Sequence, residues 1–106
     1  MSSRNVIAVD DASFDALVLK SDQPVLLEFN SKQCAPCRAL APIVEQVANE
    51  GVGRYRVFSI DIDDAPRVTT RYGIRAVPTL LAFHGAVPKG QLVGIQKKDA
   101  ILNLVR

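Results

Sequence analysis

The sequence has no tryptophan, one histidine and two cysteines among its 106 residues. A closed zinc site takes four ligands, usually cysteine or histidine, so these three side chains cannot complete one. Two cysteines that are only three positions apart also cannot form the disulfide framework of a small secreted domain. Reactivity therefore explains Cys34 and Cys37 better than architecture does.

Long apolar runs and blocks of charge are missing as well. No apolar stretch reaches the roughly 18 residues of a transmembrane helix, so no membrane partner is expected. The net charge is +2 and the longest basic run is Lys97-Lys98, which argues against nucleic-acid binding. Asp10, Asp11 and Asp15 lie where a signal peptide needs an apolar run, and the expected location is the cytoplasm. No bound metal or organic cofactor is expected.

The composition is that of one folded domain. Apolar residues make up 48% and charged residues 23%, which are ordinary values for a globular protein. A chain of this length buries roughly two-thirds of its unfolded surface, enough for a genuine core. Because no linker or repeat interrupts the sequence, residues 1–106 are expected to form a single domain. The protein is expected to be a monomer.

The hydrophobic periodicity changes repeatedly along the chain. Strands are expected at residues 5–9, 25–29, 55–62, 79–83 and 91–95. Helices are expected at residues 11–18, 34–49 and 66–73, and from about residue 97 to the C-terminus. The order β-α-β-α-β-α-β-β-α predicts an α/β domain with a mixed five-stranded sheet, helices on both faces and an antiparallel final strand pair.

Several residues are expected to begin or bend these helices. Asp11 is a candidate cap for the first helix, and Asp63 and Asp64 are candidate caps for the helix that begins at Pro66. Pro42 lies inside the second helix, so a kink is predicted there.

The motif Cys34-Ala35-Pro36-Cys37 lies between a buried strand and the start of a helix, where Pro36 suits the first turn. Unpaired N–H groups and the helix dipole favour an anion there, and only the thiolate of a cysteine attacks disulfides. Cys37, one turn later, can attack the resulting mixed disulfide. Cys34, nearer the helix end and expected to be more exposed, is predicted to be the attacking thiolate and Cys37 the resolving thiol. A lone CxxC also fits half a zinc site, but this strand–helix context favours redox chemistry.

With the motif in place, nearly the whole chain from about Val6 resembles the thioredoxin family. The matching segments are Ser13-Phe14-Asp15, residues 24–29, Cys34-Ala35-Pro36-Cys37-Arg38, Ala41-Pro42, Asp61-Ile62-Asp63 and residues 72–80. The resemblance implies the thioredoxin fold and a reductase of disulfide-containing protein substrates. It also implies a partner thioredoxin reductase, a flavoenzyme that supplies electrons from NADPH.

The resemblance implies a substrate-binding surface around the cysteines. The Val77-Pro78 bond is implied to be cis and to face the cysteine pair, and the Val77 backbone is then free to pair with an extended substrate segment. An ordinary turn proline is the alternative. Gly94 falls at a family glycine where a side chain would crowd the partner; a tolerated small residue in an edge strand is the alternative. Gln33, Ala35 and Pro36 are expected to complete this surface.

Glu28 occupies the place of a buried aspartate in the family. Desolvation between Leu27 and Phe29 should raise the pKa of this carboxyl group, so that it can accept a proton from Cys37 through water. The family's lysine near this acid corresponds to Ser59, so Glu28 lacks that charge partner. A glutamate that reaches solvent from a strand end is the alternative.

The sequence departs from the family pattern around the cysteines. Gln33 and Asn30 stand where the family usually has tryptophan, and Ala35 replaces a glycine. These changes make the rim of the site more polar and predict a narrower or shifted set of targets. Lys32 and Arg38 favour the thiolate and acidic partners, with plain solvated charge as the alternative.

Two rival functions remain open. A docking module would use the surface at Val77 and Pro78 without turnover, and should bind its partners equally well after Cys34→Ser. A disulfide-forming or isomerising relative would share the fold but hold a more oxidising cysteine couple. Pro36 resembles the reducing members of the family and argues against that second rival.

Overall fold

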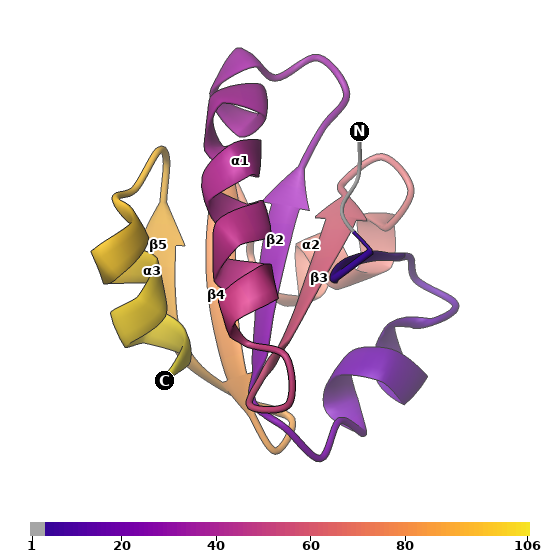
Figure 1. Cartoon of the computed structure of the whole chain (residues 1–106). Coiled ribbons are helices and arrows are strands. Elements are labelled where there is room, and N and C mark those ends of the chain that lie inside the picture. The colour runs from indigo at the N-terminus through magenta and orange to yellow at the C-terminus, as the bar shows by residue number, and fades with distance from the viewer. Residues whose placement is uncertain (1–3) are drawn as a thin grey trace.

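A five-stranded mixed sheet with the strand order β1-β3-β2-β4-β5 forms the centre of the computed structural model, which describes residues 4–106 (Figure 1). The strands are β1 (Val6–Val9), β2 (Val25–Asn30), β3 (Arg56–Asp61), β4 (Thr79–His84) and β5 (Val87–Val93). The helices are η1 (Asp15–Leu19), α1 (Ala35–Glu50), α2 (Pro66–Arg71) and α3 (Lys98–Val105). β1, β3 and β2 run parallel, whereas β4 is antiparallel to both β2 and β5. The predicted mixed α/β sheet is confirmed, although the first helix is only a five-residue π-helix.

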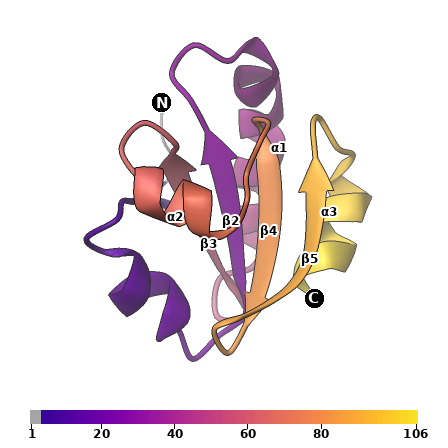
Figure 2. The same ribbon diagram turned by 180° about the vertical axis from the view of Figure 1, so that it is seen from behind.

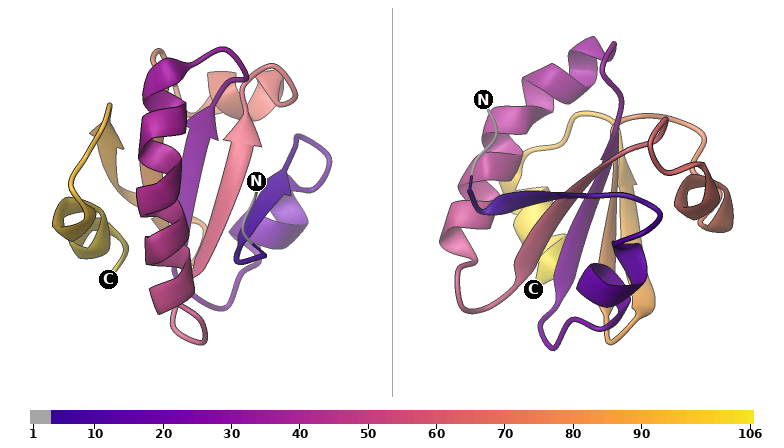
Figure 3. Two further views of the ribbon diagram at one scale, coloured as in Figure 1. Left: turned by 45° about the horizontal axis from the view of Figure 1, so that its top comes forward. Right: turned by 90° about the vertical axis from the view of Figure 1, so that its right-hand side faces the viewer.

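Helices cover both faces of the sheet, as the right panel of Figure 3 shows. α1 and α3 lie on the face turned to the viewer in Figure 1, and α2 crosses the opposite face in Figure 2. The core against α1 and α3 comprises Leu26, Leu40, Val44, Val47, Ala48, Tyr55, Val57, Leu80, Ile101, Leu102 and Val105. The core against η1 and α2 comprises Val9, Phe14, Val18, Val25, Leu27, Phe29, Phe58, Ile60, Ala65, Val68, Leu81 and Phe83.

The central strand β2 is buried on both faces, as its nearly unbroken apolar run predicts. Side chains alternate along a strand, so Leu27 and Phe29 pack toward α2 while Leu26 and Glu28 lie on the face of α1. β2 thus carries one acidic side chain into the interior beneath α1.

The last strand begins four residues earlier than predicted and ends at Val93. Gly85 and Ala86 both have positive φ, which closes a short hairpin with β4 directly after His84. Pro88 belongs to this strand because β5 is at the edge of the sheet, where a missing N–H removes no ladder bond to a further strand.

The predicted caps of the first and third helices are wrong. Asp10, not Asp11, closes the turn before η1, by exchanging hydrogen bonds with Ser13 at 3.0 Å. Asp11 instead accepts the backbone N–H groups of Arg67 and Val68 at the start of α2, both at 3.0 Å. The packing of η1 beside α2 thus brings Asp11 to a helix that lies far along the chain.

Neither Asp63 nor Asp64 makes a capping bond to α2. The N-cap residue of this helix is Ala65. The carboxylate of Asp61 accepts the N–H of Asp63 at 2.8 Å, so these acidic residues order the turn that follows β3.

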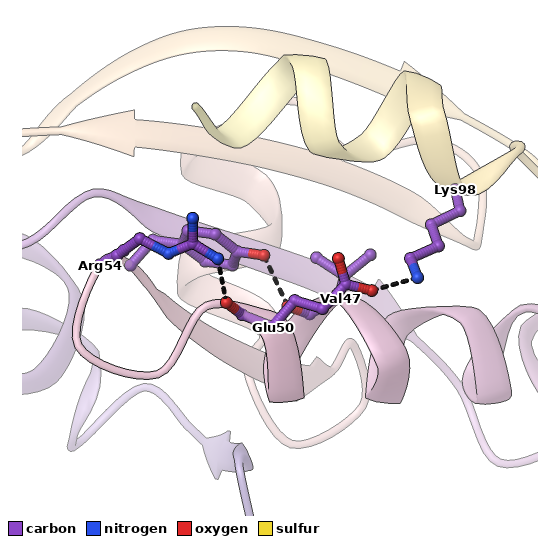
Figure 4. Close-up of polar contacts among 5 residues, drawn as sticks. Val47, Glu50, Arg54 and Lys98 are labelled. Atoms are coloured by element: carbon purple, nitrogen blue, oxygen red, sulfur yellow. Dashed lines mark hydrogen bonds and ion pairs between the residues drawn. The ribbon is translucent and has the colours of Figure 1, made fainter.

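Polar contacts fix the C-terminal end of α1 (Figure 4). The hydroxyl of Tyr55 donates to the carbonyl of Val47 at 2.6 Å, and Arg54 donates to the carbonyl of Glu50. Lys98 of α3 forms an ion pair with the Glu50 side chain. α1 is continuous through Pro42, and the kink predicted at that residue stays a prediction.

Candidate redox site

The two cysteines lie where β2 leads into α1, at the upper edge of the sheet in Figure 1. Cys34 is the N-cap of α1 and has extended backbone, with φ −133° and ψ 101°. Pro36 occupies the first turn, where its fixed φ suits the helix and its missing N–H leaves no bond unmade. The predicted position of the motif at a helix N-terminus is therefore confirmed.

Cys34 and Cys37 form a disulfide, with their Cα atoms 5.2 Å apart. The Sγ atom of Cys34 accepts the backbone N–H of Cys37 at 3.1 Å, and the Cys34 carbonyl accepts the N–H of Arg38 at 3.2 Å. An N–H that points at sulfur, together with the positive end of the helix dipole, stabilises a thiolate on Cys34 when the bond is open.

The expected difference in exposure between the two cysteines is not found. Each is 6% exposed: the Val77 carbonyl lies against Cys34, and Cys37 is among the buried residues of α1. The two cysteines differ in their surroundings. The Sγ of Cys34 accepts an amide N–H, whereas Cys37 lies on the buried side of α1.

The Val77-Pro78 loop faces the cysteine pair, and its peptide bond is cis, as the resemblance implied. The carbonyl oxygen of Val77 lies 3.8 Å from Sγ of Cys34. Pro78 itself is buried, so its side chain is turned away from solvent. Within residues 4–106 the N–H and C=O of Val77 have no backbone hydrogen-bond partner.

Gly94 lies directly after β5, next to the proline loop. Its N–H donates to the carbonyl of Pro78 at 2.8 Å, and its φ is +86°. A Cβ at this position would meet no atom within 4 Å, so the positive φ, rather than crowding within the chain, favours glycine. Gly94 lies outside the edge strand, which ends at Val93, and its expected role against a partner stays a prediction. The neighbouring Val93 and Ile95 are exposed.

The remaining rim of the site is exposed. Gln33, Ala35 and Pro36 all face solvent beside the disulfide. Arg38 donates from Nη1 to the backbone carbonyl of Lys32 at 3.4 Å, which places the Arg38 guanidinium next to the motif. The rim is polar and basic where the family usually has aromatic residues.

Glu28 is buried, with only 4% of its surface exposed, so the alternative of a solvent-exposed glutamate is wrong. Burial raises the pKa of its carboxyl group to about 7, and a hydrogen bond from Asn30 opposes that rise. Ser59 is its direct neighbour on β3 and Leu80 its neighbour on β4, so neither adjacent strand supplies a cation.

The hydrogen bond from Asn30 to Glu28 was not predicted from the sequence. Asn30 was recognised only as a replacement for tryptophan. The signal was present in the spacing, because residues i and i+2 of one strand share a face. Asn30 donates from Nδ2 to Oε1 of Glu28 at 3.3 Å.

Two further observations concern other classes of site. Within residues 4–106, no three or more histidine, cysteine, aspartate or glutamate side chains are grouped so as to hold a metal ion. None of the helices in that part of the chain is long and apolar enough to cross a membrane.

A disulfide at a helix N-terminus, with a proline loop opposite and a buried carboxyl group on the preceding strand, defines a thiol–disulfide oxidoreductase. The family model described as Thioredoxin matches residues 5–106. The chain belongs to the thioredoxin family, and the resemblance inferred from its motifs is confirmed.

Named relatives agree with this assignment. The chain is 37% identical over 97 residues to "Thioredoxin" of Rickettsia felis, an alignment that covers 92% of each protein. It is 36% identical over 100 residues to "Thioredoxin M5, chloroplastic" of Oryza sativa, which covers 94% of this chain and 58% of the relative. It is 39% identical over 96 residues to "Thioredoxin M-type, chloroplastic" of Pisum sativum, covering 91% of this chain and 56% of the relative. The chain thus spans little more than half the length of these plant relatives.

Proposed function

We propose that this protein reduces disulfides in protein substrates, with Cys34 as the attacking thiolate and Cys37 as the resolving thiol. One observation carries the proposal: Sγ of Cys34 accepts the N–H of Cys37 at the start of α1. That bond stabilises negative charge on Cys34, and the adjacent carbonyl of Val77 marks where a substrate backbone would lie.

The reaction runs in two exchanges. The Cys34 thiolate attacks one sulfur of the substrate disulfide, forms a mixed disulfide and releases the other substrate sulfur as a thiolate. Cys37 then loses its proton and attacks Sγ of Cys34, which closes the Cys34–Cys37 disulfide and releases the second substrate thiolate. Two electrons pass from the dithiol to the substrate, and the disulfide form is the end product on this chain.

Glu28 is the proposed acceptor of the Cys37 proton, through water. It is buried on the face of the sheet that α1 covers, and Cys37 is the only titratable residue among the buried residues of α1. A carboxyl group with a pKa of about 7 is populated in both protonation states near neutral pH, so it can take up and return a proton.

Substrates are proposed to dock on Gln33, Ala35, Pro36, Val77, Pro78 and Gly94. The N–H and C=O of Val77, which have no backbone partner within residues 4–106, support the addition of an extended substrate segment as a short strand. The exposed Gln33 and the polar Asn30 support a narrower or shifted set of targets, because they offer less apolar surface than tryptophan.

Electrons are proposed to come from NADPH through a flavoenzyme thioredoxin reductase. Membership of the family supports this assignment. A cytoplasmic location stays a prediction, since the matched relatives include chloroplastic proteins as well as bacterial ones.

The test is the equilibrium reduction potential of the Cys34–Cys37 couple in a glutathione or dithiol buffer, with Cys34→Ser as the control. A value at or below the cytosolic poise of about −220 to −320 mV is expected for a reductase. A value far above that window would identify an oxidase or isomerase instead. If no disulfide formed, and partners bound equally well after Cys34→Ser, the protein would be a docking module.

A further inference from the structure

Glu28 is held in the interior without a cation. The row of residues beside it across the sheet is Ala8, Ser59, Leu80 and Leu92, none of which ionises. Glu28 takes part in no ion pair within residues 4–106. Cys37 is the one titratable group among the buried residues of α1, and the buried residues of α3 are all apolar. No charge therefore offsets the cost of burying this carboxylate, and burial raises the pKa of the acid.

Asn30 provides the one side-chain hydrogen bond that Glu28 receives, from Nδ2 to Oε1 at 3.3 Å. The backbone of Asn30 is itself fixed, since its carbonyl accepts the N–H of Ile62 at 2.9 Å. A donor held in this way stabilises the ionised carboxylate more than the neutral acid. The amide dipole of Asn30 thus stabilises the ionised carboxylate in part, as the charge of a neighbouring ammonium group would.

The two carboxyl oxygens of Glu28 are not equivalent. Within the described chain, no fully enclosed side-chain oxygen lacks a hydrogen-bond partner. The bond from Asn30 is made at Oε1, so Oε2 is not fully enclosed and keeps access to solvent. Water can therefore reach Oε2, which accepts no hydrogen bond within the described chain, whereas Oε1 is held by Asn30.

We propose that Asn30 is a positioning residue: its amide holds Oε1 of Glu28 and leaves Oε2 to exchange the proton of Cys37 through water. The proposal rests on the proposed role of Glu28 as proton acceptor. Asn30 itself makes no contact with the reacting sulfur atoms. It sets the orientation of the acid and the balance between its two protonation states.

The experiment follows the titration of the Glu28 carboxyl carbon by NMR in the reduced full-length protein. Asn30→Ala and Asn30→Leu both remove the donor, and Leu keeps the approximate size of the side chain. We expect either variant to lower the ionisation constant of Glu28 by about tenfold, moving its midpoint up from about 7. The pH profile of disulfide reduction should move in the same direction. Asn103→Ala, on the exposed side of α3, is the control and should leave both midpoints unchanged.

Failure of this proposal and failure of the proposed role of Glu28 give different results. If Asn30→Ala or Asn30→Leu folds and the titration of Glu28 stays at the wild-type midpoint, Asn30 does not position the carboxyl group. If Glu28→Gln leaves the pH profile of reduction unchanged, the role of Glu28 as proton acceptor fails. In that case the profile cannot report on Asn30, and the titration alone decides whether Asn30 holds the acid.

Discussion

The two faces of the sheet contain different kinds of side chain. The face packed on η1 and α2, here called the aromatic face, contains all four phenylalanines of the chain, together with the half-buried Tyr72. Three of these rings, those of Phe14, Tyr72 and Phe83, contact one another at centroid distances of 5.3 to 6.0 Å. The face packed on α1 and α3, here called the carboxylate face, is mainly aliphatic and contains the buried Glu28.

This difference separates stability from chemistry. Interlocking rings give dense packing, and the buried residues of this face include no ionisable side chain. The carboxylate face places one titratable acid beneath the helix that begins at the cysteines, and lines its surroundings with small or aliphatic side chains. Substitutions on the aromatic face should therefore change the free energy of unfolding and leave the redox properties alone. Substitutions at Glu28 should change how the free energy of unfolding and the redox properties depend on pH.

The largest expected change in stability comes from Phe83→Ala on the aromatic face. Phe83 is 1% exposed and makes edge-on contacts with Phe14 and Tyr72. Removing its ring should lower the free energy of unfolding by about 3–5 kcal/mol, measured by urea denaturation. The reduction potential of the cysteine couple should stay at the wild-type value.

The matched control is Val52→Ala, which shortens an apolar side chain that is 66% exposed. This variant should change the free energy of unfolding by no more than about 0.5 kcal/mol. A shifted reduction potential in Phe83→Ala would show that the two faces are coupled, and the separation drawn above would be wrong.

A somewhat smaller effect is expected from Glu28→Gln on the carboxylate face. The pKa of Glu28 is raised on folding from its ordinary 4.5 to about 7, so the folded state keeps a proton that the unfolded state has lost. The wild-type free energy of unfolding should therefore fall as pH rises from about 4.5 to 7, by about 3 kcal/mol in total, and then level off. Gln cannot ionise, so the variant should lose this slope and be the more stable protein above pH 7.

Urea denaturation at a series of pH values measures this slope. Gln46→Ala, which shortens an exposed and uncharged side chain on α1, is the control and should keep the wild-type slope. An unchanged slope in Glu28→Gln would mean that the buried acid is not the group responsible. The carboxylate face would then not be the source of the pH dependence of stability.

The order of elements and the position of the cysteines were predicted correctly because both are local properties of the sequence. Alternating apolar periods identify strands and helices, and a CxxC between them marks a helix N-terminus. The fully buried β2 was equally visible as a short apolar run. These features need no knowledge of which distant segments pack together.

Apart from the hydrogen bond between Asn30 and Glu28, the features that were not predicted depend on distant partners. The burial of Cys34 involves a contact with Val77, which lies 43 positions further along the chain. The early start of β5 was hidden because Pro88 and Gly90 have low strand propensity, and only an edge position tolerates them. Asp10 and Asp11 are equally good capping residues, and the packing of η1 decides which helix each one serves.

The smallest effect in this series comes from Asp11, a carboxylate on the aromatic face that is structural. It accepts two N–H groups of α2, one at each oxygen, from residues 56 and 57 positions away. Asp11→Ala should lower the free energy of unfolding by about 1 kcal/mol, as expected for the loss of a helix cap, without changing the reduction potential. Asp11→Asn keeps one acceptor and should lose about half as much. If Asp11→Ala were as stable as the wild type, α2 would be held by the apolar contacts of Val68 alone. If instead the reduction potential moved, a carboxylate on the aromatic face would affect the cysteines after all, and chemistry would not be confined to the face that contains Glu28.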